Sequence, residues 1–130
     1  MCQILLSINP EHVKNILLGT KLFEFRKVRC RAGVDKIIIY ATAPEKMVVA
    51  EAEVEDIIED EVDIVWNITG EFSGISYDFY KSYYEGKDKA VAYKLGKVKK
   101  YKEPKSLSEL GIRQAPQSFI YMEEHHQTSL

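Results

Sequence analysis

The chain has 130 residues, of which 45% are hydrophobic and 29% are charged, and its formal net charge is −2. This length and composition predict one globular domain with its own core. The near-neutral charge argues against a uniformly cationic nucleic-acid binder, two cysteines are too few for a disulfide-rich secreted scaffold, and the apolar runs are too short for a membrane helix. No basic region of a signal peptide precedes the first apolar stretch. We therefore expect a cytoplasmic domain over residues 1–123, without membrane association, and a flexible polar tail over residues 124–130.

The first half of the chain predicts several strands and one short helix. A buried strand is expected over residues 4–8. Asn9 is a favoured N-cap, Pro10 suits the first helical position and Gly19 is a favoured helix stop, so a helix is predicted over Pro10–Leu18. Alternation or β-branched content then predicts strands over residues 22–26, 36–41 and 48–54.

The second half predicts helices followed by strands. Helices are expected over residues 63–68 and 76–84, and a strand over residues 90–95 that extends through 98–102 if Gly96 does not interrupt it. Ser106 and Glu109 have capping-box spacing before a helical turn closed by Gly111, and residues 118–122 form the last strand. About six strands with three or four short helices, in no regular strand–helix alternation, predict a mainly β, α+β fold: a small mixed β-barrel.

Charged residues are grouped along the chain. Lysine and arginine dominate residues 1–36 and 81–105, whereas acidic residues dominate residues 45–63. The two basic blocks would form a local positive surface if they meet in the fold, and otherwise they are ordinary solvated faces. The acidic block is also a candidate surface for a basic regulatory protein partner.

Three charged residues follow the first helix in the spacing Gly19-x-Lys21-x-x-Glu24-x-Arg26. Opposite charges on a strand face against the core are costly unless they pair or bind a ligand. An arginine can hold a phosphate or carboxylate, and a partly buried lysine can serve as a base. A structural Glu–Arg pair is the alternative. Strict alternation places Lys21 and Glu24 on opposite faces, so the three groups meet only if the backbone bends at the start of the strand.

Other candidate groups carry less information. Several tyrosines, Tyr40 among them, could form a base-stacking platform, although half-buried wall residues are the alternative. The three histidines show no metal-ligand spacing and no phosphate-cradling glycine loop occurs, so we expect neither a metal nor a cofactor. Cys30 lies between Arg29 and Arg31 and is expected to be a passive thiol.

The motif resembles the ASCH (activating signal cointegrator homology) domain. The resemblance spans roughly residues 3–122 and is carried by residues 7–10 and 16–27, with support from residues 39–44, 69–70, 74–76 and 115–121. It implies a PUA-like β-barrel with a cleft that binds RNA or a modified nucleotide, and a role in regulating transcription or translation. The residues expected to contact this ligand are Gly19, Thr20, Lys21, Glu24, Arg26 and the stacking residue Tyr40.

A smaller branch of the same family resembles amidohydrolases that deacetylate N4-acetylcytidine. That branch implies a lysine, a threonine three residues later and a downstream glutamate. Lys21 matches the lysine and Glu71 the glutamate, but Glu24 stands at the threonine position, and Thr20 lies on the other side of Lys21. Glu24 would then act as a base toward water while Lys21 stabilises the oxyanion. Hydrolysis of acylated nucleosides is therefore the alternative to binding, with Lys21, Glu24 and Glu71 as catalytic residues.

Overall fold

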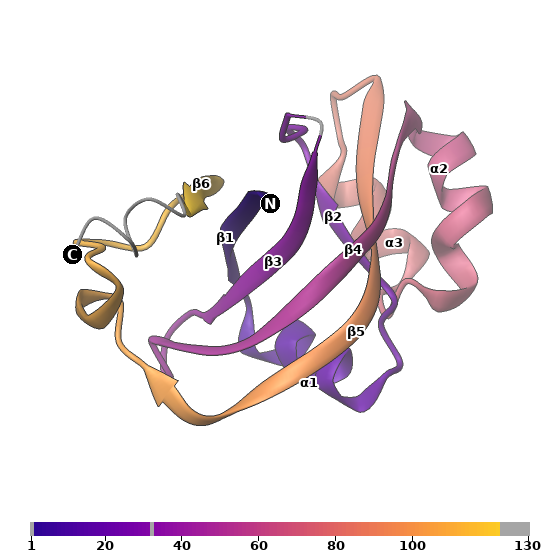
Figure 1. Ribbon diagram of the computed structural model, residues 1–130. Helices are drawn as coiled ribbons and strands as arrows, with labels where there is room; N and C mark the ends of the chain where they lie inside the picture. The colour runs from indigo at the N-terminus through magenta and orange to yellow at the C-terminus, as the bar shows by residue number, and fades with distance from the viewer. Residues whose placement is uncertain (1, 32, 123–130) are drawn as a thin grey trace.

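The computed structural model describes residues 2–31 and 33–122, which form one six-stranded mixed sheet and three α-helices (Figure 1). The strands are β1 (Cys2–Ile8), β2 (Phe23–Arg26), β3 (Val34–Ala41), β4 (Met47–Glu61), β5 (Lys89–Lys105) and β6 (Phe119–Met122). The helices are α1 (Pro10–Leu18), α2 (Val62–Thr69) and α3 (Tyr77–Tyr83), with 3-10 turns η1 (Gly70–Phe72) and η2 (Ser108–Leu110). The expected α+β, mainly β fold class is confirmed.

The sheet has the strand order β2-β5-β4-β3-β1-β6. β1 and β3 run parallel, and the other neighbouring strands run antiparallel. The long strands β4 and β5 pair along most of their length, and their register shifts at three places, which are the irregularities that bend a ladder. The sheet therefore curves strongly around the main core, as expected for a PUA-like barrel (Figure 1).

Alternation along β3 assigns its side chains to two different cores. Ile37 and Ile39 belong to the main cluster, which also holds Val13 and Ile16 of α1. Tyr40 instead belongs, with Ile38, to a cluster on the other face of the sheet, which the segment around η2 covers. A third cluster packs α2 and α3 against β2 and β5, with Tyr80 and Tyr84 among its buried residues.

Helix α1 has the predicted bounds, for the predicted reasons. The side chain of Asn9 accepts a hydrogen bond from the backbone N–H of Glu11 at 2.9 Å. Gly19 ends the helix in the left-handed region with φ +83°. Val13 and Ile16 are buried in the core, while His12 and Asn15 lie on a different face. The polar face of α1 therefore points away from the core and toward the site described below.

Two long strands exceed their prediction. The strand expected over residues 48–54 continues through the acidic segment to Glu61, and its partner β5 runs from Lys89 to Lys105 without a break at Gly96. Acidic residues have low strand propensity, but cross-strand pairing along β5 overrides that preference here. By contrast, the capping box is confirmed: Ser106 N donates to Glu109 Oε2 at 2.8 Å, and Glu109 N donates to Ser106 Oγ at 3.3 Å.

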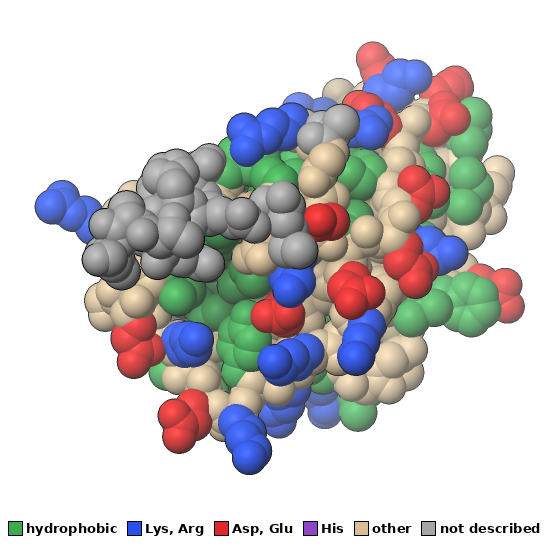
Figure 2. All heavy atoms as spheres, viewed as in Figure 1, with side chains coloured by type: hydrophobic (Ala, Val, Ile, Leu, Met, Phe, Trp, Pro, Cys, Tyr) green, Lys and Arg blue, Asp and Glu red, His purple; other side chains and the backbone are tan. Residues whose placement is uncertain are grey.

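The acidic strand β4 forms ion pairs with cations of both basic blocks of the sequence. It lies between β3 and β5, so its carboxylates pair with cations from both sides. These ion pairs are Lys36–Glu51 at 2.8 Å, Arg29–Glu59 at 3.1 Å and Lys94–Glu55 at 3.8 Å. Figure 2 accordingly shows blue and red side chains interspersed on one face of the molecule. The visible face therefore carries charges of both signs and no continuous positive surface.

Two expectations concern the limits of the chain. No helix in residues 2–31 and 33–122 is long and apolar enough to cross a membrane. The flexible tail expected over residues 124–130 lies outside the residues that the structure describes.

Candidate functional site

A cavity of about 500 Å³ opens between α1, β2 and the segment that leads into α3. Its wall includes Lys21, Glu24 and Arg26, so the structure brings these three sequence-predicted residues to one hollow. The other polar lining residues are Asn9, Glu11, His12, Asn15 and Ser76, and the aromatic ones, besides His12, are Phe25, Phe79 and Tyr83. The lining of the site thus combines charged and aromatic side chains.

Lys21 reaches the cavity because it precedes the regular strand. β2 begins only at Phe23, so the alternation rule that would separate Lys21 from Glu24 does not apply. Leu22 is held by two backbone hydrogen bonds, from its N–H to Phe72 O and from Leu95 N–H to its carbonyl, both 2.9 Å long. The bend that the motif required is therefore made by attachment to η1 on one side and to β5 on the other.

The side chain of Lys21 is buried. The residue is 2% exposed, and its Nζ donates a hydrogen bond to Ser73 O at 2.9 Å and lies 5.0 Å from the centroid of the Phe25 ring. No second acceptor for this ammonium is found among the described residues. Burial lowers the pKa of Lys21, the Glu24 carboxylate opposes that shift, and Arg26 adds to it. When the amine is protonated, two of its N–H donors have no acceptor among the described residues.

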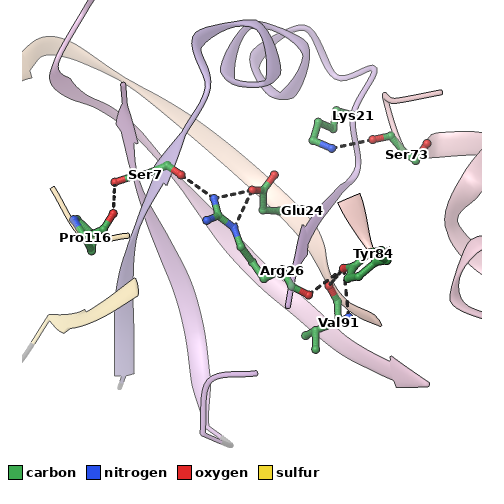
Figure 3. Close-up of polar contacts among 8 residues, drawn as sticks. All are labelled: Ser7, Lys21, Glu24, Arg26, Ser73, Tyr84, Val91 and Pro116. Carbon is green, nitrogen blue, oxygen red and sulfur yellow. Dashed lines mark hydrogen bonds and ion pairs between the residues drawn. The ribbon is translucent and has the colours of Figure 1, made fainter. Parts of the chain in front are cut away.

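Glu24 and Arg26 form an internal ion pair, drawn in Figure 3. Arg26 Nε and Nη2 donate to the same oxygen, Glu24 Oε2, at 3.1 and 2.8 Å, and Nη2 also donates to Ser7 O at 2.7 Å. Tyr84 Oη donates to Arg26 O at 2.8 Å. The Nε and Nη2 donors of Arg26 are thus already used within the protein. By contrast, Glu24 Oε1 accepts no hydrogen bond from any residue described.

Four other sequence-predicted residues lie outside this cavity. Gly19 ends α1, and the exposed Thr20 donates through Oγ1 to Asn15 O at 3.2 Å. Tyr40 lies in the cluster on the other face of the sheet, because it alternates with Ile39 along β3, so it cannot stack on a ligand here. Glu71 is exposed on η1 and is not part of the cavity wall.

The aromatic and imidazole groups of the wall were not assigned from the sequence. Tyr83 and Phe79 of α3 line the cavity, whereas Tyr40 does not. Burial raises the pKa of Tyr83, and Lys27 Nζ lies 4.6 Å from the centroid of its ring. His12 packs edge-on against Phe79 with ring centroids 5.5 Å apart. One sequence pattern could have identified His12 as a lining residue. His12 and Asn15 stand three residues apart in the predicted helix, a spacing that puts both polar side chains on one face.

The chemistry of the wall suits a flat polar ligand. It offers ammonium donors from Lys21, a carboxylate acceptor from Glu24, an imidazole from His12 and aromatic faces. Within residues 2–31 and 33–122, no cluster of three or more His, Cys, Asp or Glu side chains could hold a metal ion. Stacking combined with a few hydrogen bonds is how proteins hold single nucleobases.

Comparison of the sequence with known proteins gives one family model and several relatives. The model, described as a domain of unknown function (DUF365), matches residues 10–115. The chain is 36% identical over 94 residues to an ASCH domain-containing ribonuclease of Zymomonas mobilis, covering 72% of this chain and 64% of that protein. It is 38% identical over 87 residues to the large ribosomal subunit protein uL22 of Ureaplasma parvum, which covers 67% of this chain but only 28% of that protein. The chain thus spans a minor part of the latter relative.

Solved structures resemble the whole fold. The ASCH protein from Zymomonas mobilis superimposes with a TM-score of 0.87 at 30% sequence identity, over 97% of this chain and 91% of that one. A serine-to-alanine variant of the same protein gives a TM-score of 0.87 over 98% and 92% of the two chains. The N-terminal domain of Staphylothermus marinus McrB shares the fold at a TM-score of 0.58 and 15% identity.

Proposed function

The chain belongs to the ASCH domain family, and we propose from this and from its cavity that it binds RNA by taking one nucleobase between α1 and α3. The observation that carries the proposal is the buried ammonium of Lys21. Lys21 is 2% exposed and lines a cavity of about 500 Å³, and one of the three N–H donors of its ammonium is hydrogen-bonded to Ser73 O. A buried cation with unused donors is costly unless a ligand uses them.

The roles of the charged residues differ from those of a phosphate clamp. Arg26 is bound by Glu24 and by Ser7 O, so it organises the wall instead of meeting a phosphate. Lys21 donates to an acceptor on the base, and Glu24 Oε1 accepts from a ring N–H or an exocyclic amine. Tyr83 and Phe79 supply the stacking surfaces. The RNA backbone then stays outside the cavity, and regulation of transcription or translation would follow from such binding.

The relative named as a ribonuclease supports RNA as the ligand class. The amidohydrolase alternative has less support from the geometry, because Glu71 is exposed and does not line the cavity with Lys21. A protein-partner role has a candidate surface in the acidic strand, but Glu51, Glu55 and Glu59 there already pair with cations of the same chain. Binding of a nucleobase is the function that the cavity favours.

Binding of a short, labelled single-stranded RNA, measured by fluorescence anisotropy, tests the proposal. We expect Lys21→Met to weaken binding at least about tenfold, which is about 1.4 kcal/mol. Lys97→Met removes an exposed lysine outside the cavity and is the matched control, expected to change affinity less than about threefold. Affinity should fall only shallowly with salt, because few phosphates are neutralised.

Two results would contradict this proposal. Equal loss of affinity in Lys21→Met and Lys97→Met would mean that RNA contacts only surface charge. Release of cytidine from N4-acetylcytidine by the wild-type protein, lost in Lys21→Met, would replace binding with hydrolysis as the function of the cavity.

A further inference from the structure

His12 lines the cavity and carries a buried polar atom that the protein leaves without a hydrogen-bond partner. Its Nδ1 is fully buried, and among the described residues it is the one buried side-chain nitrogen or oxygen without a hydrogen-bond partner. The residue comes from the first turns of α1, and its ring meets Phe79 edge-on, with centroids 5.5 Å apart and planes at 73°. Both residues line the same hollow as Lys21.

A packing role alone does not account for this imidazole. The edge contact with Phe79 would be made equally by a phenylalanine, and a leucine would fill similar space, and neither of these has a buried polar atom without a partner. Buried polar groups in folded proteins nearly always find a partner, so each exception calls for one supplied from outside. His12 lines the cavity, so a molecule bound there, with a small turn of the imidazole ring, is a candidate source of that partner.

The charged surroundings of His12 favour its uncharged form. Burial lowers its pKa below the ordinary value of 6.5, and the ammonium of Lys21 lowers it further. The carboxylates of Glu24 and Glu11 oppose this shift, and Arg26 supports it. An uncharged imidazole offers one donor or one acceptor at Nδ1 and no net charge. Such a group recognises the polar edge of a neutral ring better than it recognises a phosphate, which would also face the Glu24 carboxylate.

We propose that His12 is a specificity-determining residue, which hydrogen-bonds through Nδ1 to the uncharged base edge of a nucleoside held against Lys21 and Glu24. This inference rests on the proposed function and adds to it the class of ligand: the base enters the cavity and the phosphates do not. His12 then favours bases that present a hydrogen-bonding group complementary to Nδ1, and disfavours bases that do not.

Three substitutions separate the polar role of Nδ1 from the packing role of the ring. His12→Asn keeps an amide group where Nδ1 lies, His12→Gln places its amide where Nε2 lies, and His12→Leu keeps the bulk with no polar atom. Binding of adenosine, cytidine, guanosine and uridine to the full chain is measured by calorimetry, with inorganic phosphate as a further probe. The melting temperature of each variant reports on folding.

For the tightest of the four nucleosides, we expect His12→Leu and His12→Gln to lose about tenfold or more in affinity, and His12→Asn to stay within about threefold of wild type. The preference among the four bases should become smaller in His12→Leu. That variant should melt at or above the wild-type temperature, because it removes a buried polar atom that has no partner.

Distinct results overturn the inference and the proposed function. Wild-type affinity in His12→Leu, with Lys21→Met still impaired, overturns the role of His12 and leaves nucleobase binding in place. Binding of inorganic phosphate as tight as that of the best nucleoside overturns the ligand class. Absence of binding by all four nucleosides and by RNA overturns both. A lower melting temperature in His12→Leu together with unchanged preference among the bases assigns His12 a structural role only.

Discussion

Gly74 and Lys21 lie so close together that a Cβ on residue 74 would meet the Cβ of Lys21 at 2.6 Å and its Cγ at 2.8 Å. Gly74 also has φ +73°, a backbone conformation that residues with a Cβ rarely adopt. The neighbouring Ser73 is 0% exposed and accepts the hydrogen bond of the Lys21 ammonium. The segment around Gly74 therefore both covers the aliphatic part of Lys21 and holds its charged end.

Gly74→Ala should destabilise the fold and displace the segment around Gly74 from Lys21. We expect a loss of about 1–2 kcal/mol from the positive φ and about 1–3 kcal/mol more from the clash. Urea unfolding measures the sum. Gly111→Ala is the matched control, because Gly111 has φ +75° with nothing within 4 Å of the added carbon, so it should show the conformational cost alone. Equal costs at the two positions would contradict the packing of Gly74 on Lys21.

Arg26→Met should be among the most destabilising single changes in the cavity wall. The side chains of Arg26 and Glu24 are 13% and 7% exposed, so removing the guanidinium leaves a buried carboxylate unpaired, at a cost of about 3–5 kcal/mol. The double variant Glu24→Gln/Arg26→Met should lose less than the sum of the single losses. A double-mutant cycle by urea unfolding checks this, with the exposed pair Lys81–Asp63 as control, whose coupling should be much weaker because solvent screens it. Additive losses at Glu24 and Arg26 would argue against the pair.

Tyr84→Phe should loosen the end of β2 that carries Arg26. Tyr84 is 2% exposed, and its hydroxyl donates to Arg26 O at 2.8 Å, with Val91 O at 3.2 Å. Deleting the hydroxyl leaves a backbone carbonyl without this partner, which should cost about 1–3 kcal/mol in the free energy of unfolding. Tyr77→Phe, at a residue 46% exposed, should cost less than about 0.5 kcal/mol. Comparable thermal stability of the two variants would contradict the structural role of Tyr84.

The uncharged state of His12 predicts a particular pH dependence of stability. Its pKa is lowered in the fold from 6.5, so between these two values the unfolded chain binds a proton that the folded chain does not. The contribution of His12 is therefore complete above about pH 6.5 and is lost as the pH falls toward its lowered folded value. Urea unfolding at about pH 7.5, 6.5 and 5.5 should show a steeper acid loss in wild type than in His12→Asn. Parallel profiles would mean that His12 titrates normally in the fold.

The sequence predicted most of the local structure because local signals specify it. The Asn9 cap, Pro10 and Gly19 act within one helix, and the bounds of α1 agree with the prediction. The alternation of residues 48–54 predicted the first part of β4, but its extension to Glu61 depends on pairing with β5, some 30 residues away. The hydrophobic alternation within each strand does not indicate which distant segment will pair with it.

The residues of the site likewise fall into those that the sequence predicted and those that only the tertiary structure revealed. The spacing of Lys21, Glu24 and Arg26 singled out one segment, and that choice needed only the unusual presence of three charges at the start of a strand. Tertiary structure alone decided that Ser73 and Gly74 close over Lys21, and that His12, Phe79 and Tyr83 complete the wall while the face of β3 that carries Tyr40 does not border it. Chain order determines which face a side chain takes within its own strand or helix. Which faces then enclose a common cavity depends on how the curved sheet brings α1 and α3 together, and that is settled by packing between segments distant in the sequence.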